Sequence, residues 1–344
     1  MIYYLNDMPF SLAFGGKEMQ LETYFSIINN FENSKIQKLN FWEKNSVSNN
    51  SIFHLFGSAK WYHSVVSQIK ANFNPHKIII NPNFYFLPSL KLKASSKIVK
   101  FLPYKSDFYF KEFVFKNADL LITNSIAEKE LICSLFGKDL ASKIETIYNV
   151  IPDNFREIQK EIDIEKYFNI KKKYILSVGL LDERKNSINM IKAFLNTQHQ
   201  HDNILVIVGK FRFTNPVNYK IAEQLIKSNT KRIIHITNIS PNSNELKSLY
   251  KNCDLHFLPS HVETPGISNI EALSFGKKIL VGDCPPVAEY FKNYAFYCNS
   301  YSLQSVSKSL EIAISEDTPQ GNSLFSENYM VSSIKEKVKK IYEN

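Results

Sequence analysis

Two glutamates, Glu263 and Glu271, stand in the segment whose residue types best suit the binding of a phosphorylated ligand. The run LPSHVETPGISNIEALSFG, residues 258–276, reads as a strand end, a loop around Gly266 and a helix that begins near Ser268, a preferred N-cap residue. A helix start offers free N–H groups and the positive end of its dipole to a phosphate. Glu271 follows about one turn later, where its carboxylate can accept hydrogen bonds from two ribose hydroxyls. The segment therefore predicts a nucleotide site, with two solvated glutamates as the alternative.

Two adjacent cations, Arg184 and Lys185, mark a second segment, SVGLLDERKNSINMIKAF, residues 177–194. A strand is expected to end there at Gly179, and a helix is expected to begin near Ser187. Cations at such a junction can neutralise a diphosphate and stabilise the charge that grows on it as a bond to it breaks. The alternative is a pair of solvated surface cations.

Short β-branched runs alternate with helical patterns from residue 174 onward, which is typical of βαβ units and a parallel sheet covered by helices. The predicted strands are Tyr174–Gly179, Ile204–Gly209, Arg232–Thr237, Asp254–Ser260, Lys278–Asp283 and Ala295–Asn299. Apolar residues three and four apart predict helices over Ile188–Thr197, Asn244–Asn252, Ser268–Phe275, Val287–Lys292 and Leu303–Ser315. Both motifs then lie at the carboxyl edge of the sheet, where open α/β folds bind ligands.

The first half of the chain repeats this alternation less clearly, so the predicted fold class is α/β with two Rossmann-like domains. Its predicted strands are residues 1–6, Ile36–Phe41, Ile52–Phe56, Lys77–Asn81, Leu120–Asn124 and Ile144–Val150, with helices over Lys17–Phe31 and Ala59–Ala71. Pro152 and a run of charges predict a linker at 152–172. We therefore expect domains at 1–151 and 173–318, with a closing helix at 326–344 that returns to the N-terminal domain.

These motifs give the chain a resemblance to the retaining glycosyltransferases of family 4, whose GT-B fold consists of two facing Rossmann-like domains. That family's signature is two glutamates separated by seven residues, as Glu263 and Glu271 are. The resemblance implies that Glu271 holds the ribose of the sugar donor and that Glu263 lies against the donor sugar and its reacting centre. It also implies donor contacts from Gly266, Ile267 and Ser268, although TPGIS here departs from the commoner GFGLP.

The resemblance extends to the basic motif and to the turn before the donor loop. It implies that Arg184 and Lys185 act on the leaving diphosphate, with Gly179 beside it; many relatives carry an arginine directly after this glycine, where this chain has Leu180. The turn that begins at Ile239 corresponds to one that lies against the nucleotide base in relatives. Ordinary loop packing explains that turn almost as well.

In the first half, the resemblance implies that Gly15 and Gly16, ahead of a predicted helix, face the donor. A plain turn is an equally good interpretation of a Gly-Gly pair. Relatives usually place a histidine or another polar residue after the strand KIIIN, where this chain offers Asn81 and Asn83. His54 lies inside a strand pattern and is predicted to be a packed core histidine.

No metal site is predicted, because the four cysteines form no C-x-x-C pair and the acidic run EIDIE, Glu161–Glu165, falls in the predicted linker. The net charge of +9 favours an anionic partner. The stretch Leu90–Lys116 interleaves lysines with aromatic residues and predicts a patch for an anionic membrane surface. A solvated helix with core aromatics is the alternative. We expect no nucleic-acid partner, because the basic residues match no recognised module.

The resemblance implies a metal-independent, hexosyltransferase-type enzyme without a cofactor. It would move a sugar from a nucleoside diphosphate sugar to a saccharide or lipid-linked acceptor, with retention, in the synthesis of surface polysaccharide or glycolipid. The alternatives are a sugar-nucleotide epimerase or hydrolase of the same fold and a sugar-nucleotide-binding protein without turnover. No apolar run approaches the roughly 18 residues of a membrane span, and Asp7 interrupts any signal peptide. We therefore expect a cytoplasmic protein that is peripheral at the inner face of the membrane.

Overall fold

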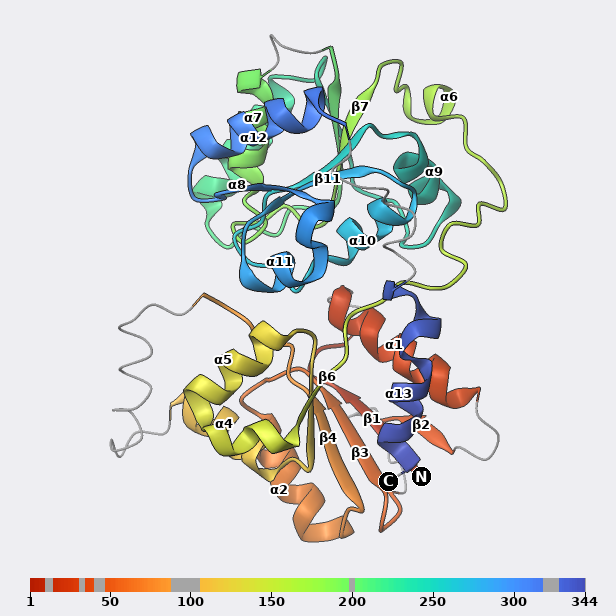
Figure 1. The fold of residues 1–344 in the computed structure, drawn as a ribbon, viewed down its shortest axis with the longest axis vertical. Helices are drawn as coiled ribbons and strands as arrows, with labels where there is room; N and C mark the ends of the chain where they lie inside the picture. Colours follow the sequence, from red (N-terminus) through yellow and green to blue (C-terminus); the bar gives the residue numbers. More distant parts are fainter. Residues whose placement is uncertain are drawn as a thin grey trace. The chain divides into compact units, whose positions relative to one another are not determined.

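The computed structural model describes residues 1–9, 15–30, 35–39, 47–87, 106–197, 202–317 and 328–343. The chain divides into two compact units, each built around one parallel sheet (Figure 1). Unit 1 comprises Met1–Asn149 and Ile334–Asn344, and unit 2 comprises Val150–Ser333. The α/β class and the two parallel sheets predicted from the sequence are confirmed.

The described part of unit 1 contains a six-stranded sheet in the order β2-β1-β3-β4-β5-β6. Its strands are β1 (Ile2–Asn6), β2 (Ile36–Lys38), β3 (Ile52–Phe56), β4 (Lys77–Asn81), β5 (Leu120–Thr123) and β6 (Ile144–Thr146). Its helices are α1 (Gly16–Asn29), α2 (Tyr62–Phe73), α4 (Asp107–Asn117), α5 (Ile126–Phe136), the 3-10 helix η2 (Lys138–Lys143) and, from Ile334 onward, α13 (Val331–Glu343).

The described part of unit 2 contains a six-stranded sheet in the order β12-β11-β10-β7-β8-β9. Its strands are β7 (Tyr174–Val178), β8 (Ile204–Val208), β9 (Ile233–Ile236), β10 (Leu255–Leu258), β11 (Lys278–Gly282) and β12 (Phe296–Cys298). Its helices are α6 (Ile164–Phe168), α7 (Ser187–Thr197), α8 (Pro216–Lys227), α9 (Asn244–Asn252), α10 (Ile267–Ser274), α11 (Pro285–Phe291), the 3-10 helix η4 (Lys292–Tyr294) and α12 (Leu303–Ser315).

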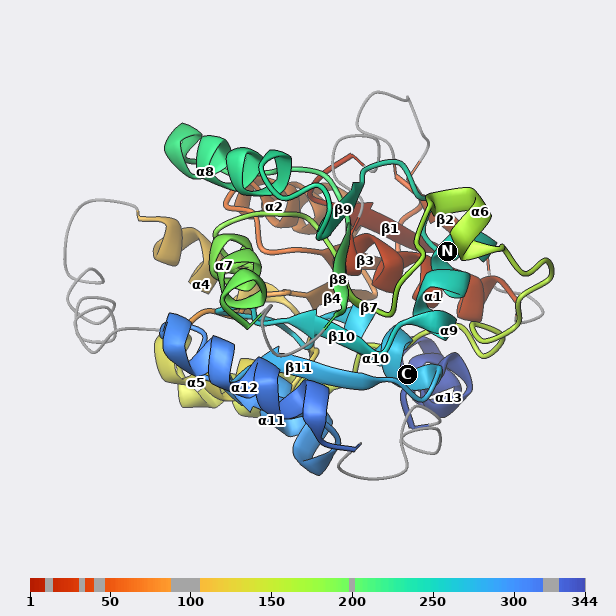
Figure 2. The ribbon, with the colours of Figure 1, turned by 90° about the horizontal axis from the view of Figure 1, so that it is seen from above.

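Side chains that alternate along the strands of unit 2 bury against different helices, because successive residues of a strand point to opposite faces. Leu205 and Ile207 of β8 pack in one core with α7, α8 and α12. On the other face, Tyr174 of β7 donates from its hydroxyl to the Leu249 carbonyl of α9 at 2.7 Å. Figure 2 shows α7, α8 and α12 on the opposite side of this sheet from α9 and α10. Sheets covered in this way need apolar residues on both faces, which explains the continuous apolar runs in the sequence.

The interval 152–172, predicted to be a linker, is instead part of unit 2 and contains α6. Its polar residues bond to α9: the Ile162 N–H donates to Ser248 Oγ at 3.2 Å, and Lys251 pairs with Glu161 at 2.9 Å. Asp163 caps α6 by accepting from the Lys166 N–H. The acidic run is therefore used for capping and pairing, which a composition-based reading cannot distinguish from solvation.

Two further helices, α5 and α8, lie where the sequence analysis proposes none. In α5, the side chain of Ser125 accepts from the Glu128 N–H, which is an N-cap contact. Pro216 opens α8, and Asn215 caps it. Both starts carry recognisable signals, Ser-x-x-Glu and Asn-Pro, that predict helix N-termini when they are sought directly.

The stretch predicted as a membrane-facing patch, Leu90–Lys116, is described only from residue 106 onward. There, α4 buries Val114 and Phe115, and Phe108 and Phe113 pack against the same core. Tyr109 remains 45% exposed. In this part of the stretch, Phe115 is therefore a core residue, and Phe108 and Phe113 pack against the core. In the described ranges no helix is both long and apolar enough to cross a bilayer.

Candidate functional site

The backbone at the carboxyl edge of the unit 2 sheet is packed so closely that glycine is required at two strand ends. A Cβ on Gly209, after β8, would lie 1.9 Å from the Gly179 carbonyl oxygen, and one on Gly282, in β11, would lie 2.0 Å from the Ser260 carbonyl oxygen. Gly179 has a φ of +147°, and the side chain of Lys185 lies over it. The loop after β7 therefore lies against the end of β8, and the loop after β10 lies against the end of β11.

Glu263 unites the two sequence motifs, because its carboxylate accepts hydrogen bonds from both cations of the basic motif. Arg184 Nη1 donates to Glu263 Oε1 at 2.8 Å, and Lys185 Nζ forms an ion pair with the same oxygen. Burial by itself would raise the pKa of Glu263, but the positive charges of Lys185 and Arg184 outweigh it and lower that pKa. Glu263 is therefore a buried, ionised carboxylate, and neither it nor Lys185 is a solvated surface residue.

The basic loop is held by Asp182, a residue that the sequence analysis did not single out. Its Oδ1 accepts from the Lys185 backbone N–H at 2.7 Å, and its Oδ2 accepts from Arg212 Nη2 at 2.8 Å. Three cations thus contact two carboxylates, those of Asp182 and Glu263, which leaves a surplus of one positive charge. An aspartate three residues before the lysine is the sequence signal for this turn.

Asn186 is a second residue that the sequence analysis missed. Its backbone has a φ of +57°, a conformation that asparagine tolerates better than most residues. Its side-chain amide donates to the Pro259 carbonyl at 3.1 Å and to the Ser300 carbonyl at 2.7 Å. It therefore ties the basic loop to the ends of β10 and β12.

The helix of the glutamate motif begins one residue before Ser268, so the prediction of Ser268 as its N-cap is wrong. Gly266 is the N-cap, with a φ of +85°, and α10 begins at Ile267. A Cβ on Gly266 would lie 2.9 Å from Asn269 Nδ2. The left-handed conformation at Gly266 turns the chain into the helix, which overrides the N-cap preference of serine. Ile267 and Ser268 are then in the first turn, whose N–H groups precede the first i→i−4 bond.

Glu271 is buried on α10 and accepts a hydrogen bond from the Tyr250 hydroxyl at 2.6 Å. Burial raises the pKa of Glu271 to about 7, and the bond from Tyr250 only partly offsets this. The Tyr250 hydroxyl is a neutral donor, so the carboxylate lacks the charged partners that stabilise Glu263. The two glutamates of the motif therefore differ: near neutral pH Glu263 is ionised, whereas Glu271 takes up or releases a proton.

The chain resembles known proteins in sequence and in fold. Residues 159–330, half of the chain, match the family described as "Glycosyl transferases group 1". The chain belongs to this family. The solved structure of Anabaena Alr3699/HepE in complex with UDP-glucose has a TM-score of 0.75 at 15% identity and covers 99% of both chains. At this identity the likeness shows the fold, which is GT-B.

Two relatives of this group 1 family member are named as glycosyltransferases. It is 28% identical over 201 residues to the O-antigen chain mannosyltransferase RfbU of Salmonella typhimurium, which covers 57% of this chain and 52% of that protein. It is 25% identical over 220 residues to the processive diacylglycerol alpha-glucosyltransferase of Acholeplasma laidlawii, which covers 61% of this chain and 62% of that protein. The matches thus span about half to three fifths of these relatives' lengths.

In this group 1 family member, the predicted residues Gly15 and Gly16 lie in unit 1 at the start of α1. The Gly15 N–H donates to Oε2 of Glu18, the third residue of α1, at 3.0 Å. The buried carboxylate of Glu18 thus occupies an amide that the resemblance assigns to the donor. Gly16 is the first residue of α1.

His54 is the packed core histidine that its strand pattern predicts. It is fully buried, its Nε2 bonds Asn81 Oδ1 at 2.7 Å, and burial lowers its pKa to about 3. Asn83 is half-buried, and its Oδ1 accepts from Asn124 Nδ2 at 2.7 Å. Asn81 is therefore a buried residue that bonds within the core, whereas Asn83 is the more accessible of the two asparagines.

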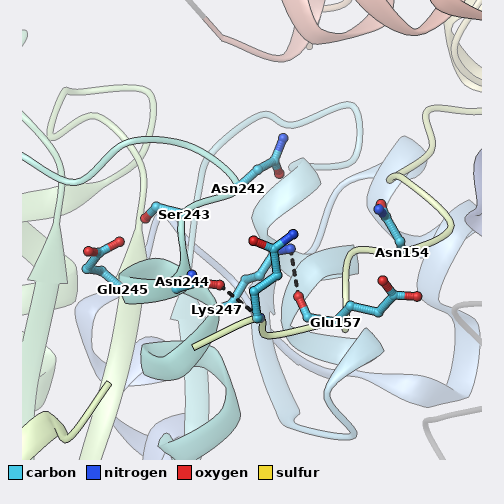
Figure 3. A pocket seen from close by; sticks show the side chains of 8 residues that line it. Asn154, Glu157, Asn242, Ser243, Asn244, Glu245 and Lys247 are labelled. Carbon is cyan, nitrogen blue, oxygen red and sulfur yellow. Dashed lines mark hydrogen bonds between the residues drawn. The ribbon is translucent and has the colours of Figure 1, made fainter. Parts of the chain in front are cut away.

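A pocket of about 330 Å³ lies beside the N-terminus of α9 (Figure 3). Across it Lys247 Nζ donates to the Glu157 carbonyl at 3.0 Å, and the Gln159 N–H donates to Asn244 Oδ1 at 3.2 Å. Ile239 lies in the turn just before the pocket but does not line it. Within the described ranges, no group of three or more His, Cys, Asp or Glu side chains is arranged to hold a metal ion.

Proposed function

We propose that this chain transfers a glycosyl group from a nucleoside diphosphate sugar to a hydroxyl of a saccharide or lipid-linked acceptor, with retention at the anomeric carbon. The observation that carries the proposal is the surplus positive charge around Glu263 and Asp182. It lies at the carboxyl edge of an open sheet and close to the first turn of α10. An anionic diphosphate would neutralise that surplus.

In the proposed reaction, the bond between the anomeric carbon and the diphosphate oxygen breaks while the acceptor oxygen bonds to the same face of that carbon. Lys185 and Arg184 stabilise the negative charge that accumulates on the departing diphosphate. Its oxygen accepts the proton that the acceptor hydroxyl loses. Glu263 keeps both cations in place and offers its carboxylate to a donor-sugar hydroxyl. These steps use the chain's own side chains and need no cofactor.

Glu271 is proposed to accept hydrogen bonds from the ribose hydroxyls, with Gly266, Ile267, Ser268 and Gly179 providing backbone approach to the diphosphate. Its environment supports this role, because a buried carboxylate that is bonded to a neutral donor, the Tyr250 hydroxyl, gains from further donors. Ile239 is proposed to lie against the base. Gly15 and Gly16, at the start of α1, are proposed as further donor contacts.

The relatives support a nucleotide-sugar donor and an acceptor of a surface polymer or glycolipid. Alr3699/HepE was solved with UDP-glucose, RfbU is named for O-antigen chains, and the Acholeplasma enzyme is named for diacylglycerol. The net charge of +9 suits a peripheral place at an anionic, cytoplasmic membrane face. Sedimentation with vesicles with and without anionic lipid tests that placement, and an equal lack of binding to both vesicle types would reject it.

The test of the reaction is incubation with UDP-sugars and GDP-sugars, first alone and then with saccharide and lipid acceptors. NMR of the new glycosidic bond should show the anomeric configuration of the donor, and an inverted product would reject retention. Release of nucleoside diphosphate without an acceptor indicates a hydrolase. Donor binding without turnover indicates a binding protein, which is the second candidate. Two features of the sequence favour it: Leu180 follows Gly179, and asparagines stand at positions 81 and 83.

A further inference from the structure

His256 is a fully buried histidine in β10 that the proposed reaction does not use. Its Nε2 accepts from the Val178 backbone N–H at 3.4 Å, so Nδ1 carries the proton and donates to Asn269 Oδ1 at 2.9 Å. Asn269, 1% exposed, lies in the first turn of α10. The histidine thus bridges a strand end and a helix start.

The hydrogen bond between Val178 and His256 lies where two strands of the unit 2 sheet separate. The neighbouring strands β7 and β10 pair at Ile175 with Leu255 and at Leu176 with His256, and they separate towards the carboxyl edge. Beyond that point, the His256 imidazole takes the Val178 N–H that a strand neighbour would otherwise bind. The next residue is Gly179, over which the Lys185 side chain lies. The imidazole therefore bonds the end of β7 at the point where β7 and β10 separate, directly before the glycine that the Lys185 side chain covers.

Asn269 continues the network into the loop that carries Glu263. Its Nδ2 donates to the Pro265 carbonyl at 3.2 Å, and its backbone N–H donates to the Gly266 carbonyl at 2.9 Å. A Cβ on Gly266 would lie 2.9 Å from the same Nδ2. Asn269 thus bonds both residues that precede α10, Pro265 through its side-chain amide and Gly266 through its backbone N–H.

We infer that His256 and Asn269 are positioning residues that hold the donor loop, residues 260–266, in the geometry that presents Glu263 and the first amides of α10 to the donor. Both side chains are buried, so they are proposed to act through the loop and not on the reacting atoms. The inference rests on the proposed function for what the loop binds. Whether these hydrogen bonds hold the loop in place is tested on the protein without ligand, independently of what the loop binds.

The experiment compares N269A and H256Q with H54Q. Glutamine can keep part of the hydrogen bonding of an imidazole, whereas alanine at 269 removes both side-chain bonds. His54 is a matched control, because it too is fully buried and bonded to an asparagine, but it lies in unit 1. Hydrogen–deuterium exchange of residues 261–268 is measured without ligand, and the Kd for UDP and for GDP is measured by calorimetry.

We expect N269A to speed amide exchange in 261–268 and to raise the Kd of the better nucleotide by about tenfold, the effect of one lost hydrogen bond on a buried network. H256Q should show a smaller change of the same kind, and H54Q should change neither quantity. Wild-type exchange in both N269A and H256Q would overturn the inference, as would faster exchange with an unchanged Kd. If the wild type binds neither nucleotide, the proposed function fails, and the exchange result alone decides whether the network positions the loop.

Discussion

The ammonium of Lys185 and the carboxylate of Glu263 form an ion pair inside unit 2, where solvent reaches 12% of the lysine side chain and 10% of the glutamate side chain. Arg184 shares the same carboxylate oxygen at 2.8 Å. Because one carboxylate faces two cations, Glu263 does not neutralise all of the positive charge around it. Its remaining positive charge is the feature of the site best suited to an anionic ligand.

Lys185→Ala is expected to lower kcat by about 10²- to 10³-fold, the usual effect of removing one group that stabilises charge in a transition state. Steady-state kinetics with the donor identified for the wild type measures this. Lys227→Ala is the control, because Lys227 pairs with Glu223 on α8 and its side chain is 71% exposed. A Lys185→Ala enzyme with wild-type kcat would remove the lysine from the proposed reaction.

Nucleotide affinity is expected to fall as the pH drops below about 7. The pKa of Glu271 is raised to about 7, and ribose hydroxyls donate to the ionised carboxylate, so at lower pH the group must first lose a proton. Calorimetry from pH 5.5 to 8 should show about a tenfold loss of affinity for each pH unit below the pKa. Glu271→Gln should bind more weakly at pH 8 and show little dependence on pH. An unchanged Kd in that variant would place the ribose elsewhere.

Through Glu271, a lower pH should stabilise the folded protein, although it weakens the binding of nucleotide. Its pKa in the folded state, about 7, lies above the ordinary value of 4.5 for a glutamate, so the folded state binds the extra proton between these values and loses stability as the pH rises through them. Glu271→Gln keeps an oxygen for the Tyr250 hydroxyl and removes the buried charge. We expect it to raise the free energy of unfolding by roughly 1 to 3 kcal/mol at pH 8 and to have a smaller effect at pH 5. Urea unfolding at the two pH values measures this, and a destabilised variant at pH 8 would contradict it.

Gly266→Ala and Gly276→Ala separate backbone strain from loss of the site. Both glycines have positive φ, +85° and +69°, so each alanine variant carries a strain of about 1 kcal/mol. A Cβ at Gly276 meets open space, whereas one at Gly266 would lie 2.9 Å from Asn269 Nδ2. Gly266→Ala should therefore lose more thermal stability than Gly276→Ala and also bind nucleotide more weakly. Equal nucleotide affinities would show that the donor loop tolerates the displacement.

Much of the fold follows from local pattern. The strand Ile52–Phe56 and the helices Asn244–Asn252 and Leu303–Ser315 have the bounds that their periodicity predicts. Parallel strands buried on both faces need runs of apolar residues, and such runs are visible without a structure. The composition of the interval 152–172 predicts a linker, whereas in the structure its charged residues bond to a helix about 90 positions further along the chain, as Glu161 does to Lys251.

The sequence by itself determined the two α/β units, the glutamate pair, the basic loop and the glycines at the strand ends, because each depends on residue type and short spacing. Only the tertiary structure decided that Glu263 pairs with Lys185 and Arg184, that Glu271 receives a hydrogen bond from Tyr250, and that α10 begins after Gly266. Asp182, Asn186 and His256 likewise gained their roles from partners distant in sequence. Charge and burial act through space, so the ionisation of each glutamate is set by whichever segments the fold brings against it.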